Sequence, residues 1–143
     1  MATVFDVAAY ILDKQGEITA MKLQKLVYYS QAWALVWVDR PLFPERIEAW
    51  ANGPVVPELY AAHRGCYQMK AGMIAGDPSQ LSEEDKEVIH PVLAFYGDKS
   101  SRWLSDLTHA EAPWRDARTG LAALERGNRE ITLASMYEYY SAL

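Results

Sequence analysis

The sequence predicts a mostly α-helical fold: one compact domain over residues 1–143, with a small extended insertion between its second and third helices. Two observations lead to this prediction. Apolar residues recur at helical spacing in both halves of the chain. Prolines and an Asn-Gly-Pro turn gather in residues 41–57, where helices cannot continue. A chain of 143 residues is long enough to bury about two-thirds of its unfolded surface in one core.

The chain begins with two predicted helices. Thr3 is a suitable N-cap for the first helix, and Gly16 is a suitable stop. Thr19 can cap a second helix, from about Ala20 to Val38. Its last turns carry aromatic rings, and we expect Trp33 to pack in the core.

The second helix reads as amphipathic. Leu23 and Leu26 lie on one face, which we expect to be buried, and Lys25 lies among polar residues on the other face. We therefore expect Lys25 to be solvated. The alternative is that its stem packs on an aromatic ring while its ammonium meets Glu48 or Glu58.

An extended insertion follows the second helix. Pro41 and Pro44 force an extended turn, residues 47–50 read as a short strand, and residues 52–54 form a strong turn signal. Pro57 suits the first turn of a third helix that runs to about His63. Residues 66–75 are predicted to be a loop or a short strand. The residues expected to be buried are Leu23, Leu26, Val27, Ile47, Trp50 and Leu104.

The C-terminal half contains further helix starts. Ser82, followed by three acids, caps a helix expected to reach Tyr96, with a kink or break at Pro91. Ser100 or Ser101 can cap the next helix, and residues 111–114 begin a short turn or helix. Thr132 can cap a last helix.

The charge distribution limits the choice of partner. The net charge is −5, and residues 77–143 hold all of it, with twelve acidic and seven basic residues. Phosphate backbones need a concentrated basic face, so we expect no direct nucleic-acid partner. The acidic half either attracts a basic protein or keeps the domain soluble.

Neither a membrane nor a secreted location is indicated. No apolar run approaches the roughly 20 residues that span a bilayer. The N-terminus lacks the basic region of a signal peptide, and the single cysteine, Cys66, excludes a disulfide framework. We therefore expect a cytoplasmic protein.

Catalytic motifs are weak. His63 and Cys66 are three residues apart, but His90 and His109 lie far along the chain, and zinc needs four converging groups. No nucleophile elbow or phosphate-binding loop is present. We expect a protein that is not an enzyme and carries no cofactor or metal. A small metal- or cysteine-dependent hydrolase built on His63, Cys66 and His109 remains the alternative.

Three blocks of the chain match one known pattern. A first block pairs a helix motif with a GPVVP turn, a second is built around Pro113-Trp114-Arg115, and a third is the last helix. The matching residues are 22–29, 31–33, 41–43, 47–50, 53–57 and 59–60, then 104–109, 113–115 and 117–118, and finally 131–140.

With these residues the chain resembles the Panacea antitoxin domain family, which includes phage-associated GepA-like proteins and SocA-like proteolytic adaptors. The resemblance implies an antitoxin that neutralises a cognate protein toxin by direct binding, either by occlusion or by delivery to a AAA+ protease. A prophage accessory protein with a non-toxin partner is a further alternative. The motif residues to which we assign a mainly structural role are Leu23, Lys25, Leu26, Trp50, Gly53, Pro54, Val55 and Pro57.

A surface for the partner is also predicted. Aromatic and arginine side chains dominate the energetics of protein interfaces. We hypothesise one toxin-facing patch formed by Trp37, Tyr60, His63, Trp114 and Arg115.

Overall fold

The computed structural model describes all residues, 1–143. It confirms the mostly helical fold, with seven α-helices, one 3-10 turn and five short strands. In chain order these are α1 (Val4–Gln15), β1 (Ile18–Thr19), α2 (Ala20–Trp37), β2 (Ile47–Trp50), β3 (Gly53–Val55), α3 (Pro57–His63), β4 (Gln68–Met69), η1 (Pro78–Gln80), α4 (Glu83–Tyr96), α5 (Ser101–Ala110), α6 (Ala112–Ala117), β5 (Glu130–Ile131) and α7 (Leu133–Ser141).

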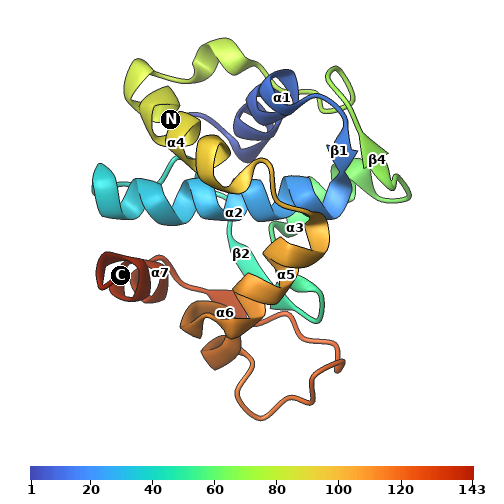
Figure 1. Cartoon of the computed structure of the whole chain (residues 1–143), viewed down its shortest axis with the longest axis vertical. Helices are drawn as coiled ribbons and strands as arrows, with labels where there is room; N and C mark the ends of the chain where they lie inside the picture. Colours follow the sequence, from blue (N-terminus) through green and yellow to red (C-terminus); the bar gives the residue numbers. More distant parts are fainter.

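Helix α2 lies at the centre of the molecule. It crosses the middle of Figure 1, with α1 and α4 on one side and α6 and α7 on the other. Of its 18 residues 13 are buried, among them Gln24 and Lys25. The expectation of a solvated polar face is therefore wrong. Neighbours cover α2 all around, so its polar side chains lie inside the protein.

The helix ends are set by local side chains, as expected. Thr3, Thr19, Ser82, Ser100 and Thr132 each accept a hydrogen bond from a main-chain N–H in the first turn of the following helix.

The break considered at Pro91 does not occur, because α4 continues unbroken to Tyr96. Pro91 lies on the exposed side of α4, where water can reach the carbonyl group that its ring leaves without a partner. None of the helices combines the length and the apolar character needed to cross a membrane.

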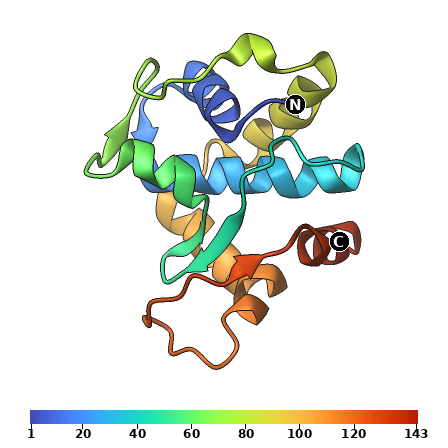
Figure 2. The same cartoon turned by 180° about the vertical axis from the view of Figure 1, so that it is seen from behind.

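Two small antiparallel sheets accompany the helices. β2 is the middle strand of the larger sheet, between β3 and β5, and Glu48 lies opposite both Val55 and Glu130. β1 pairs with β4. Figure 2 shows β2 descending from α2 to meet β5, beyond which the loop of residues 118–129 projects. The strands in the insertion were expected, but β5 was not, because its two residues acquire strand character only by pairing with β2.

The core contains five of the six residues expected to be buried, Leu23, Leu26, Val27, Ile47 and Leu104. Trp50 is the exception and remains partly exposed. Alternate residues of β2 are buried, so Ile47 and Ala49 face the core while Glu48 and Trp50 face outward. Trp33 is also only partly buried, and it packs against the edge of the core.

Truncation of Leu26 tests the central position of α2. The Leu26 side chain is fully buried in the core. We expect Leu26→Ala to lower the free energy of unfolding by about 2–5 kcal/mol, because it loses apolar burial and leaves a cavity. Chemical denaturation measures this. Leu124→Ala is the matched control, since Leu124 is 86% exposed and its truncation should have almost no effect. Equal effects of the two substitutions would contradict the assignment.

Candidate functional site

The hairpin formed by β2 and β3 covers the first half of α2, and several motif residues meet beneath its turn. Gly53 has φ of +122°, a conformation that side chains rarely adopt. A Cβ at Gly53 would lie 2.6 Å from Lys25 Cε, 3.0 Å from Lys25 Nζ and 3.3 Å from Thr108 Oγ1. The Lys25 side chain therefore occupies the space that the missing Cβ leaves free, and glycine is needed here for both conformation and packing.

Lys25 is the most unusual residue of the site. It is only 1% exposed, and its Nζ has no hydrogen-bond partner. Burial lowers its pKa from 10.5 to about 8. The alternative pairing with Glu48 is also absent, because Glu48 contacts Arg46 at 3.1 Å and accepts a hydrogen bond from Trp50 Nε1 at 2.9 Å.

His109 supplies a second buried basic nitrogen. Its Nε2 is buried without a hydrogen-bond partner, and its ring stacks on Trp114 with centroids 4.0 Å apart. Burial, and next the nearby charge of Lys25, lower the His109 pKa. We call Lys25, Gly53, Thr108 and His109 the hairpin site.

Two side chains from the C-terminal half fix the hairpin above this site. Trp114 Nε1 donates to the Trp50 carbonyl oxygen at 2.8 Å, and Arg118 Nη1 donates to the Ala49 carbonyl oxygen at 3.0 Å. The Arg118 guanidinium also lies 5.2 Å from the Trp114 ring centroid. We did not predict the role of Arg118, because no local sequence signal pairs an arginine with a strand 69 residues away.

His63 has a structural role that differs from the one expected. It is only 2% exposed, and Gln24 Nε2 lies 3.0 Å from its Nε2. Gln24 Oε1 meanwhile accepts the Val56 N–H at 2.9 Å, which orients the amide so that its NH₂ group donates to His63. The nitrogen that a Cys66–His63 dyad would use as a base is thus already bonded. No group of three His, Cys, Asp or Glu side chains is placed to hold a metal ion.

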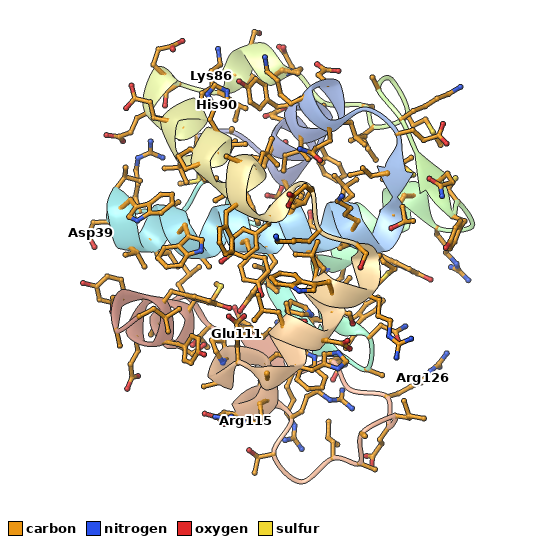
Figure 3. All side chains as sticks on the ribbon, viewed as in Figure 1. Asp39, Lys86, His90, Glu111, Arg115 and Arg126 are labelled. Carbon is orange, nitrogen blue, oxygen red and sulfur yellow. The ribbon has the colours of Figure 1, made fainter.

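The five residues hypothesised as one partner patch are not brought together. Trp114 and His63 are buried and hold the hairpin and α3. Tyr60 is partly exposed beside Trp50, with ring centroids 5.0 Å apart. Trp37 and Arg115 are exposed but lie apart. Figure 3 places Arg115 on the outer side of α6 and Asp39, just beyond Trp37, at the far end of α2.

A continuous aromatic surface does exist, and it includes Trp37. Trp37 stacks on Trp33 with centroids 5.1 Å apart, and Trp33 Nε1 donates to Tyr96 OH at 3.0 Å. The Tyr96 ring contacts Phe95 at 4.7 Å, and Lys99 Nζ lies over both Phe95 and Trp103, 5.8 and 5.3 Å from their centroids. We call Trp37, Trp33, Tyr96, Phe95, Lys99 and Trp103 the aromatic stripe.

A buried carboxylate network supports the stripe from beneath. Glu111 Oε1 accepts hydrogen bonds from Tyr29 OH at 2.7 Å and Tyr140 OH at 2.8 Å. The Tyr140 ring in turn lies 5.6 Å from that of Trp33. Figure 3 shows Glu111 inside the molecule, and its burial raises its pKa. The network ties α7 to α2 and fixes the orientation of Trp33.

Substitution at Gly53 should destabilise the protein through strain and a clash with Lys25. We expect Gly53→Ala to lower the free energy of unfolding by about 2–5 kcal/mol. Gly65→Ala is the matched control, because Gly65 has φ of +89° but no atoms near an added Cβ, so it reports strain alone. In a Lys25→Ala background the excess cost of Gly53→Ala should disappear. An unchanged excess in denaturation would exclude the clash.

Lys25→Met should raise stability at pH 7, since it removes an ammonium buried without a partner. The lowered pKa of Lys25 corresponds to roughly 3 kcal/mol of lost stability below pH 8. Between about pH 8 and 10.5 the unfolded state binds more protons than the folded state, so the parent protein gains stability as the pH rises. The difference between parent and variant should therefore shrink from pH 7.5 to 9.5 in urea denaturation. A constant difference would show that the Lys25 pKa is unshifted.

Comparisons with known proteins place this geometry in a family. Residues 23–115 match the model described as "Antitoxin SocA-like, Panacea domain". The chain is 32% identical over 124 residues to Antitoxin SocA of Caulobacter vibrioides (strain NA1000 / CB15N). That alignment covers 76% of this chain and 66% of the relative. No solved structure matches the fold. Lys25, Gly53, Thr108 and His109, which form the hairpin site, and Trp114 beside it all fall within the matched range. The protein belongs to the SocA-like antitoxin family with a Panacea domain.

Proposed function

We propose that this protein neutralises a protein toxin by binding it directly. The observation that supports the proposal is the antitoxin family match over residues 23–115. The chain spans 66% of the length of the SocA relative, so the activity of that whole protein is carried over here only as a proposal.

The aromatic stripe is the surface we assign to the toxin. Phe95 is 60% exposed and Trp37 48% exposed, and both belong to one connected set of rings. Soluble proteins seldom leave several large rings exposed side by side without an interaction to serve. Aromatic residues held rigidly by buried neighbours also lose little entropy on binding, and such residues carry much of the energy at interfaces.

The charge around the stripe favours a basic toxin. Residues 77–143, which supply α4, α5, α6 and α7, carry twelve acidic and seven basic residues. The first turn of α4 alone contains Glu83, Glu84 and Asp85. Complementary charge accelerates association, so the association rate should fall as salt concentration rises.

Occlusion and delivery to a AAA+ protease share this binding step. The two modes differ in the fate of the toxin, because delivery shortens the half-life of the toxin when the antitoxin is present, whereas occlusion does not. A pulse-chase measurement of the toxin in cells with and without the antitoxin separates them.

Truncation of the stripe should abolish neutralisation. We expect Trp37→Ala and Phe95→Ala each to weaken binding of the neighbouring gene's toxin by at least tenfold, the loss typical of an interface hot spot. Survival of cells that express both proteins, together with calorimetric titration, measures this. Circular dichroism and thermal melting should remain unchanged, because both rings are largely exposed.

The controls locate the interface. Leu124→Ala removes an equally accessible apolar side chain from the distant 118–129 loop and should rescue fully. Arg115→Ala tests the remaining exposed residue of the sequence-based patch on α6. Full rescue by both stripe variants would place the toxin surface elsewhere.

A further inference from the structure

We propose that the hairpin site binds a phosphate ion, with Lys25 Nζ and His109 Nε2 as its direct contacts. These two atoms are the only buried side-chain nitrogens or oxygens in the protein that lack a hydrogen-bond partner. Although Lys25 and His109 are 84 residues apart in the chain, the fold places them close enough for the Lys25 charge to act on His109. Two unrelated packing defects would not be expected to meet at one point.

The rest of α2 shows that burial alone does not leave polar groups without partners. Gln24, Ser30 and Gln31 are as buried as Lys25, and each has protein partners. A buried ammonium without a partner costs several kcal/mol, so native proteins pair such groups or bind a ligand there. The missing partner of Lys25 is therefore a component that the chain itself does not supply.

The chemistry of the surrounding groups indicates an oxyanion. Arg118 adds a further positive charge near His109, while the nearest acid, Asp106, is exposed to solvent and bonds to neither nitrogen. A cation would be repelled by this set of groups. The Asn52 carbonyl faces the His109 ring and favours a proton on Nδ1, which leaves neutral Nε2 as an acceptor.

Phosphate fits both nitrogens. One phosphate oxygen accepts from the Lys25 ammonium, and a protonated phosphate oxygen donates to neutral His109 Nε2. When His109 is protonated, a second phosphate oxygen accepts from Nε2 instead. A carboxylate has no hydroxyl group at pH 7, so it satisfies the site only when His109 is charged.

A path to the site runs past the hairpin turn. Asn52 is exposed and His109 only partly buried, and the turn is held to α5 by the bond from Ser105 Oγ to the Asn52 carbonyl oxygen, 3.2 Å long. The ligand thus needs only the turn to open, while the core beneath stays packed.

Thermal unfolding of the purified protein tests the proposal. Phosphate is titrated at pH 7 and constant ionic strength, with acetate as the carboxylate probe. We expect a saturable rise in melting temperature with phosphate, about 4 °C at ten times the dissociation constant. Acetate should give a smaller rise. Lys25→Met should abolish the rise, whereas Lys70→Met, which removes an exposed lysine, should retain it.

Two results would overturn the proposal. One is no rise in the parent protein, and the other is an equal rise in Lys25→Met, which would indicate a general salt effect. A measurement without variants stands beside these: phosphorus NMR of phosphate should show line broadening that depends on the parent protein, and absence of broadening also refutes the site. The assays use isolated protein, so their outcome is independent of toxin neutralisation.

Discussion

The burial of α2 is the constraint on which the rest of the structure depends. A helix covered by neighbours on every side must satisfy each of its polar side chains inside the protein. Gln24 and Gln31, seven residues apart, do so by bonding like short strands. Gln24 joins the N–H and C=O of Val56, and Gln31 joins the N–H of Leu42 and the C=O of Phe43. The two proline-rich extended segments are thereby held against α2 by side-chain amides.

This arrangement explains why an irregular insertion is well ordered. The segments near Pro41 and Pro57 cannot form long strands, because proline removes main-chain donors. The amides of α2 replace the missing pairing, and Trp114 and Arg118 hold the opposite edge through carbonyl groups of β2. The hairpin is thus gripped from both halves of the chain, and the hairpin site lies between the two grips.

The two candidate sites occupy opposite halves of α2 and have different physical characters. The hairpin site is buried, basic and small, which suits an ion. The aromatic stripe is exposed and apolar, lies on helices from the acidic half of the chain, and is stiffened by the Glu111 network, which suits a protein. Separation along one rigid helix allows each to be altered without loss of the other.

The sequence by itself determined the helical class, the capped helix starts and the proline-rich insertion, because capping boxes, prolines and glycines act within a few residues. It also indicated the family, through motif spacing. Tertiary structure alone decided that Lys25 is buried and Trp50 half-exposed, because helical periodicity does not show that both faces of α2 are covered. It also decided that His63 and Trp114 face inward while Trp37 joins Phe95 and Trp103, since each placement depends on partners that are distant in the chain.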